Sequence, residues 1–170
     1  MADLSLADGV CLAIVATADG PPMHGWQLVR MLAPDGDIGR IWTLSRPLTY
    51  RSLDTLEHHG YLRRDRSDAT TRRQPLMVTA AGQRAARHWL DTPVEHIRDL
   101  RTAFLVKCDI RQRANLSIAD LAQQQLRQLD SAFAAVLDTE PDPDDIAAMW
   151  RFHNASAARA VLNDLATRGT

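Results

Sequence analysis

The sequence of 170 residues predicts a mainly helical fold in which a β-hairpin interrupts a succession of helices. Two observations support this. Helix-capping residues recur ahead of apolar stretches with helical spacing, whereas residues 61–78 form two extended runs around a polar turn. The composition, with 45% hydrophobic and 24% charged residues, is that of an ordinary folded protein. The length suffices for one ample domain or two small ones.

Two helices are predicted before residue 40. The first begins at the capping box of Ser5 and Asp8 and ends before Gly20. The second covers His24 to Leu32 and is followed by a loop, Ala33–Gly39, rich in Gly and Asp. The predicted buried stripe of the second helix consists of Trp26, Leu28, Val29 and Leu32.

The third predicted helix begins at Ser45, an N-cap residue. Pro47 stands in its first turn, where a missing N–H group costs nothing. Gly60 ends the helix as its C′ residue. The predicted buried positions of this helix are Leu48, Leu53 and Leu56.

The predicted hairpin consists of Tyr61–Asp65 and Arg72–Val78 around the turn Ser67–Thr71. The turn holds no Asn-Gly or Asp-Gly pair, so the sequence leaves its register open. Thr79 caps a fourth helix, Ala80–Leu90. Three helices, a hairpin and a further helix form the plan of a winged helix-turn-helix. In that fold the third helix is presented to the major groove of DNA.

Three more helices are predicted after residue 91. A capping box over Thr92–Glu95 begins the fifth, Ser117 and Asp120 cap the sixth, and the acidic turn 140–145 precedes the seventh. Their apolar positions are Ile97, Leu100, Phe104, Leu105 and Cys108 on the fifth, Ala122, Leu126, Leu129, Phe133 and Val136 on the sixth, and Ile146, Met149, Trp150, His153, Ala157, Val161 and Leu165 on the seventh.

Three such apolar faces close little core by themselves, so we expect a second copy of the chain to cover the remainder. The alternative is that these helices fold back over the first four as one monomeric core. The sequence therefore predicts a winged helix-turn-helix domain over residues 1–91 and a C-terminal helical dimerisation domain over residues 92–170.

Charge is distributed unevenly along the chain. Between Arg40 and Pro75 there are eight arginines and four acids, whereas from Asp91 onward nine basic residues face twelve acids. A cationic segment joined to a mildly acidic one is typical of a DNA-binding protein with a separate pairing domain. No apolar run is long enough to span a bilayer, Met1–Gly20 lacks the basic start of a signal peptide, and the two cysteines form no CxxC pair. We expect a cytoplasmic protein with no membrane partner.

Motifs of catalysis and metal binding are absent from the sequence. There is no P-loop, GxGxxG, GxSxG or HExxH, and the adjacent His58 and His59 point to different faces of a helix. We therefore predict no enzymatic activity, no cofactor and no metal.

Three segments occur in an order and spacing that resemble a known family. They are His24-Gly25-Trp26, Leu44–Leu62 and Val78–Gly82, and Arg98–Lys107 is similar to the start of a longer C-terminal domain. Together they resemble the PadR family of transcriptional regulators. The resemblance implies a homodimeric winged-helix protein that binds double-stranded DNA, acts as a repressor and is released by a small hydrophobic or aromatic effector.

If the third helix enters the groove, its exposed N-terminal side chains meet DNA. The candidate DNA-binding residues are Ser45, Arg46, Thr49, Tyr50 and Arg51 on the helix and Arg63, Arg64, Thr70, Thr71, Arg72 and Arg73 on the wing. An arginine can read guanine with two hydrogen bonds, and a tyrosine can donate to phosphate. The wing is expected to add salt-sensitive backbone or minor-groove contacts. The alternatives are a core role for Tyr50 and a solvated charged hairpin.

A candidate effector pocket combines aromatic side chains with one polar group, although core packing explains the same spacing. Its residues are Trp89, Phe104, Trp150 and His153. The sequence thus predicts a PadR-like DNA-binding regulator. The alternative is a winged-helix protein-interaction module that does not bind DNA sequence-specifically.

Overall fold

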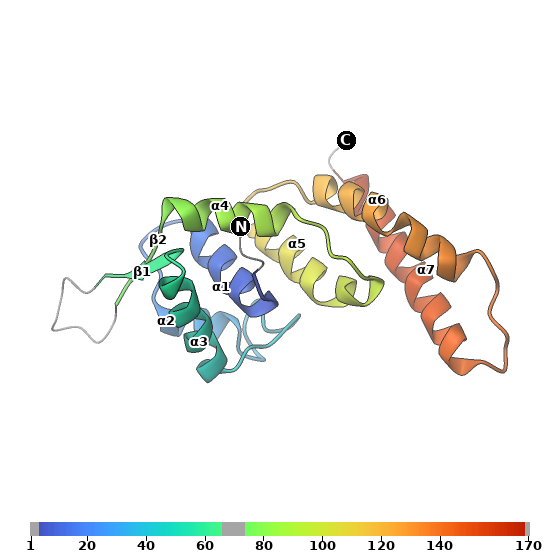
Figure 1. Ribbon diagram of the computed structural model, residues 1–170, viewed down its shortest axis with the longest axis horizontal. Helices are drawn as coiled ribbons and strands as arrows, with labels where there is room; N and C mark the ends of the chain where they lie inside the picture. Colours follow the sequence, from blue (N-terminus) through green and yellow to red (C-terminus); the bar gives the residue numbers. More distant parts are fainter. Residues whose placement is uncertain (1–3, 66–73, 169–170) are drawn as a thin grey trace. The chain divides into compact units, whose positions relative to one another are not determined.

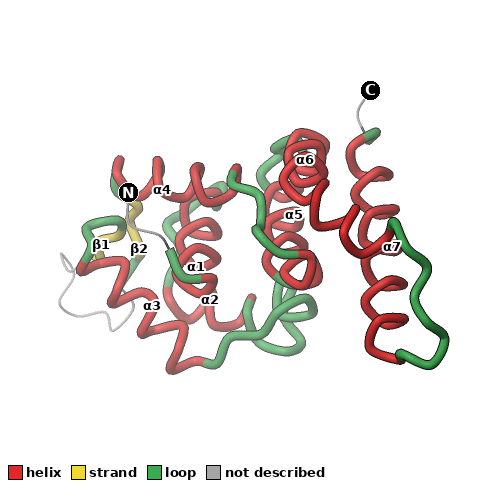
Figure 2. Tube along the Cα trace, turned by 45° about the vertical axis from the view of Figure 1, so that its right-hand side comes forward, coloured by secondary structure: helices red, strands yellow, loops and turns green. Residues whose placement is uncertain are grey.

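A computed structural model describes residues 4–65 and 74–168. Its elements are α1 (Leu6–Thr17), α2 (Gly25–Met31), α3 (Arg46–His58), β1 (Leu62–Arg64), β2 (Leu76–Val78), α4 (Ala80–Asp91), the 3₁₀ helix η1 (Ile97–Arg101), α5 (Ala103–Arg113), α6 (Ile118–Leu137) and α7 (Ile146–Ala166) (Figures 1 and 2). The predicted class, mainly helical with a hairpin after the third helix and long C-terminal helices, is confirmed. None of the helices in these ranges is long and apolar enough to cross a membrane.

The chain divides into two compact units. The first unit comprises Met1–Asp91 and Leu105–Asn115, and the second unit comprises Thr92–Phe104 and Leu116–Thr170. Val106 and Ile110 of α5 are buried in the core of the first unit, although they follow residue 91 in the sequence.

Helix α1 forms the centre of the first unit. It begins where predicted, because the hydroxyl of Ser5 accepts a hydrogen bond from the N–H of Asp8. All residues from Gly9 to Val15 are buried, and α1 packs against α3 and α4. A Cβ atom at Gly9 would collide with the ring of Trp89 on α4. Glycine therefore allows α4 to approach the centre of the core closely.

Helices α2 and α3 lie where the sequence places them, but two side chains predicted to be buried are exposed. Trp26 is 44% exposed and Leu48 is 48% exposed. The core positions of α3 are instead Thr49, Ser52, Leu53 and Leu56. These have i, i+3, i+4 and i+7 spacing, and Leu48 falls outside this stripe. On α2, Leu28 and Leu32 take the core side.

The hairpin is antiparallel, with Leu62 opposite Val78. Gly60, with a φ of +71°, ends α3 in a left-handed conformation that admits glycine without strain, as predicted. The N–H of Leu76 donates to the carbonyl of Met23 at 2.7 Å, so the segment before α2 pairs with the start of β2. The predicted turn Ser67–Thr71 lies outside the described residues.

The capping box predicted at Thr92 is wrong. The side-chain amide of Gln125, fully buried on α6, accepts from the N–H of Val94 at 2.7 Å and donates to its carbonyl at 2.8 Å. Because a distant side chain holds this backbone in place, no helix begins there. The single fifth helix predicted after Thr92, with Ile97 to Cys108 along one side, is divided between η1 and α5, and Leu105 is exposed.

Helices α6 and α7 pack along each other in the second unit (Figure 1). Ser117 caps α6 as predicted, and Leu129 and Phe133 of this helix are buried. The predicted core stripe of α7 is wrong, because Ile146 is 79% exposed and Trp150 is 70% exposed. The buried residues of α7 are Ala155 and Leu162, on the opposite face. Also on the exposed face are His153, Ala157 and Val161, whereas Met149 and Leu165 are half-buried.

Candidate nucleic-acid interface

Helix α3 turns one face to the core of the first unit and the other to solvent. Its buried residues, Thr49, Ser52, Leu53 and Leu56, fix its rotation. The opposite face exposes Arg46, Pro47 and Arg51, and Ser45 is exposed at the helix start. Ser45 is the N-cap residue, but its hydroxyl makes no capping hydrogen bond. The first two turns of α3 therefore present two guanidinium groups and one hydroxyl to solvent.

Tyr50 lies between the two faces of α3. It is half-buried and packs against the core of the first unit, as the core alternative predicts. The guanidinium carbon of Arg46, one turn earlier, lies 5.8 Å from the centre of its ring. This distance is at the outer limit of a cation–π contact. Tyr50 is thus placed to orient Arg46 as well as to anchor the helix.

Thr49 does not join the exposed set. Its side chain is fully buried, and its hydroxyl donates to the carbonyl of Ser45 at 3.1 Å. A side chain in this position reinforces the first turn of α3 from inside. Thr49 is therefore not among the side chains that α3 presents to solvent.

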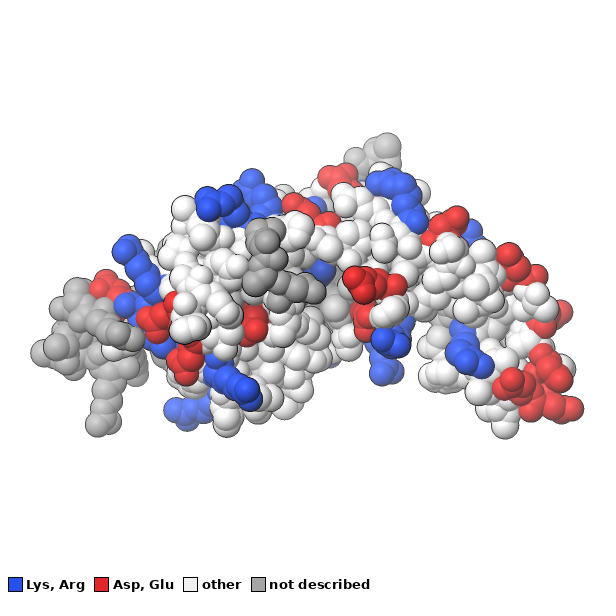
Figure 3. All heavy atoms as spheres, in the orientation of Figure 1, with Lys and Arg blue, Asp and Glu red and all other residues white. Residues whose placement is uncertain are grey.

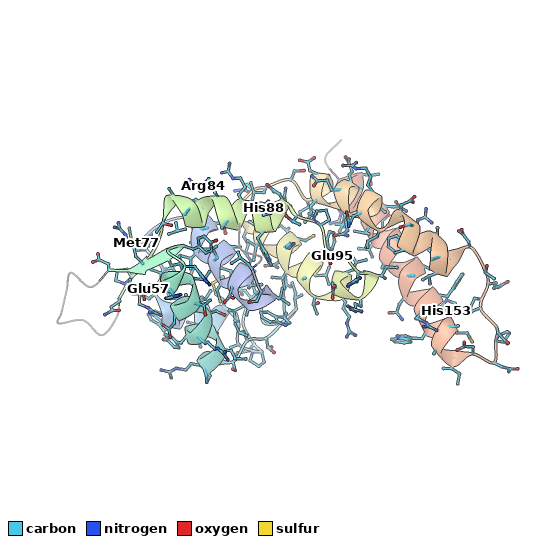
Figure 4. The ribbon with its side chains drawn as sticks, viewed as in Figure 1. Glu57, Met77, Arg84, His88, Glu95 and His153 are labelled. Atoms are coloured by element: carbon cyan, nitrogen blue, oxygen red, sulfur yellow. The ribbon has the colours of Figure 1, made fainter. Side chains whose placement is uncertain are left out.

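The wing supplies two arginines with different surroundings. Arg63 is exposed on β1. Arg64 is largely buried, and its guanidinium donates to Glu57 and to Asp54 of α3, each at 2.6 Å. Figure 4 labels Glu57 on α3, and Figure 3 shows acidic and basic side chains intermingled over this part of the molecule. The other candidates, Thr70, Thr71, Arg72 and Arg73, lie outside the described residues.

The loop ahead of α3 is held by ion pairs to α5. Asp109, nearly buried, binds Arg40 at 2.9 Å and Arg113 at 2.6 Å, and Arg113 also reaches Asp37 at 3.2 Å. The carboxylate of Asp109 raises the pKa of Arg113 above its usual value. Since residues 37 to 40 lead toward α3, this network helps to fix where the exposed helix begins.

Sequence reasoning missed two exposed apolar side chains, Trp26 on α2 and Leu48 on α3. Their exposure follows from the rotation of each helix. A helical wheel anchored on Thr49 and Ser52 as core positions would have placed Leu48 outside. Ordinary hydropathy favours the opposite choice, because leucine is usually buried and threonine and serine usually are not.

The four candidate effector-pocket residues are divided between the units, with Trp89 in the first and Phe104, Trp150 and His153 in the second. Trp89 packs on Gly9, with Nζ of Lys107 4.7 Å from its ring centre. Phe104 is buried within the second unit, whereas Trp150 and His153 are exposed on α7. Figure 4 labels His153 on α7. A shallow groove of about 360 Å³ on the second unit is lined by other residues: Leu126, Arg127, Asp130, Phe133, Arg159 and Asn163.

Within residues 4–65 and 74–168, no three His, Cys, Asp or Glu side chains are grouped so that they could hold a metal ion. Both cysteines are free and buried, and burial raises the pKa of Cys11 and of Cys108 to about 12. Neither thiol is therefore ionised near neutral pH.

No family model and no curated protein matches the chain. Among solved structures, it is similar to the crystal structure of Bacillus subtilis PadR in complex with operator DNA. The identity is 15% and the TM-score 0.42, and the match covers 92% of this chain and 96% of that chain. That structure is of a PadR protein, the family that the sequence motifs resemble.

Proposed function

We propose that this protein regulates transcription by binding duplex DNA as a homodimer, with α3 in the major groove and the wing against the backbone. The observation that carries the proposal is the exposed N-terminal half of α3. There Arg46 and Arg51 face solvent on a helix whose other face is fixed by buried side chains. A rigidly held helix with basic residues near its start is what groove recognition requires.

Each exposed side chain has a chemical role in this proposal. Arg46 and Arg51 can each read the O6 and N7 atoms of guanine. The hydroxyls of Ser45 and Tyr50 can donate to phosphate, which positions the helix without reading sequence. Arg63 adds a phosphate or minor-groove contact from the wing, and Thr70, Thr71, Arg72 and Arg73 extend it in the same proposal.

The proposed dimer is supported by α7. Ile146, Trp150 and Val161 form an apolar stripe that is exposed in the single chain. Large exposed apolar patches mark interaction sites, and a second copy of this helix is a complementary occupant. Pairing would set the distance between two α3 helices, which must match half-sites one or more helical turns apart.

The test is a binding titration of the full chain against labelled duplex from the DNA upstream of its own coding sequence. Arg46→Ala and Arg51→Ala are expected to weaken binding by about 1–3 kcal/mol each, roughly five- to 150-fold. Arg127→Ala, an exposed arginine of α6, is the matched control and should bind as wild type does.

Two results would count against the proposal. Wild-type binding no tighter than to random duplex would reject sequence-specific recognition and favour the protein-interaction module. Unchanged affinity in both α3 variants would show that the contact residues are wrong. Repression stays a prediction of the family resemblance, tested by a reporter gene under the same upstream DNA, whose expression should fall when the protein is present. Effector release also stays a prediction.

A further inference from the structure

Arg64 connects the wing to α3 through three hydrogen bonds. Its backbone N–H donates to Oε1 of Glu57 at 3.1 Å, one guanidinium nitrogen donates to Oε2 of Glu57 at 2.6 Å, and another donates to Oδ1 of Asp54 at 2.6 Å. Asp54 and Glu57 are three residues apart, so they lie on neighbouring turns of the same side of the helix. One planar guanidinium thus joins two carboxylates.

The strand pleat explains why Arg64, and not Arg63, makes these contacts. Successive side chains of a strand point to opposite sides, so Arg64 shares a side with the buried Leu62. Arg63 points the other way and is exposed. Arg63 and Arg64, adjacent and identical in chemistry, therefore lie in different environments.

Both carboxylates of α3 receive positive charge from Arg64. Asp54 lies one turn after Arg51 and is exposed on the face proposed to enter the groove. A negative charge there repels DNA phosphates, and acids in the C-terminal half of a helix also oppose its dipole. With Arg64 removed, both carboxylates would lose the charge of its guanidinium, and Asp54 would do so one turn after Arg51.

We infer that Arg64 is a positioning residue that acts on DNA binding through Asp54 and Glu57, by neutralising both and by fixing β1 against α3, instead of contacting DNA itself. This inference rests on the proposed function. It reassigns a residue for which the sequence predicted a direct DNA contact. It also implies that Arg64 contributes to the placement of the wing against the recognition helix.

The test is a double-mutant cycle on DNA affinity. Arg64→Ala is expected to weaken binding about tenfold in the wild-type background. In the Asp54→Asn/Glu57→Gln background, the same substitution is expected to change affinity by less than about twofold, because its targets no longer carry charge. Arg63→Ala is the matched control, and its loss should be equal in both backgrounds. Equal losses for Arg64→Ala in both backgrounds would overturn the inference and indicate a direct contact.

A second measurement needs no DNA. Amide hydrogen exchange of β1 should be faster in Arg64→Ala than in wild type and unchanged in Arg63→Ala. Unchanged exchange in Arg64→Ala would overturn the inference, whatever the affinities. If β1 loosens as expected but wild type binds no duplex, the proposed function fails and the hydrogen bonds of Arg64 to Asp54 and Glu57 serve only the fold.

Discussion

Lys107 is the only lysine of the chain, and it lies in the interior of the first unit. Its side chain is 5% exposed, and its ammonium nitrogen stands over the ring of Trp89. Burial lowers the pKa of Lys107 from 10.5 to about 8. The cation–π contact offsets part of the cost of burying the charge.

The stability of the protein should therefore depend on pH in a defined window. Between pH 8 and 10.5 the unfolded chain keeps the proton of Lys107 more firmly than the folded chain does. The unfolding free energy of wild type should then rise with pH relative to Lys107→Met, by about 1–3 kcal/mol across the window. Urea unfolding of both proteins at several pH values measures this. Parallel curves would show that the amine titrates normally in the folded state.

The titration itself can be observed directly because there is one lysine. Reductive methylation gives a single side-chain dimethylamine signal by NMR, distinct from that of the N-terminal amine. Its midpoint is expected near pH 8 in the folded protein and near its ordinary value in urea.

Among the elements, Gln125 of α6 binds the backbone of Val94, where the sequence predicted the start of a helix. Gln125→Leu would leave the N–H and the carbonyl of Val94 without their partner in a buried site. Each unsatisfied group costs about 1–3 kcal/mol, so the variant should lose several kcal/mol of stability. Gln128→Leu, an exposed position of the same helix, is the control and should unfold nearly as wild type does. A loss of the same size in Gln128→Leu would attribute the effect to helix propensity.

Helix ends were predictable from the sequence where the signal is local. Ser5 and Ser117 cap the helices that follow them, and Gly60 ends α3, because each acts on residues within one turn. The capping box at Thr92 failed because Gln125, thirty-one residues beyond Val94, binds that backbone instead. A nearby motif cannot reveal a competing partner that distant in the chain.

The rotation of helices was less predictable than their ends. Thr49 is buried and Leu48 is exposed, against their hydropathy, because Thr49 satisfies its hydroxyl within α3. The candidate site could be predicted only in part, because it also depends on how helices are rotated and strands are paired. Arg46 and Arg51 lie on the exposed face as expected, whereas the partners of Arg64 depend on the pairing of β1 and on which side of the strand it faces.

At the scale of the whole molecule, the exposed stripe of α7 gives a test of the dimer. Sedimentation velocity at micromolar concentration should find a dimer of the 18.9 kDa chain. Trp150→Asp or Val161→Asp should shift it to the monomer, because a charge would be buried without a partner in the interface. Ser156→Asp, exposed to the side of the stripe, should remain dimeric. A monomeric wild type would contradict the proposed dimer.

A hydroxyl-radical footprint tests most directly whether a dimer reads DNA through two copies of α3. It uses the full chain on its own upstream DNA. Two protected stretches are expected, with centres about 10 base pairs, or a whole multiple of that, apart, and both should be lost with Arg51→Ala. Uniform coverage, or no protection at concentrations where the chain is a dimer, would contradict this expectation.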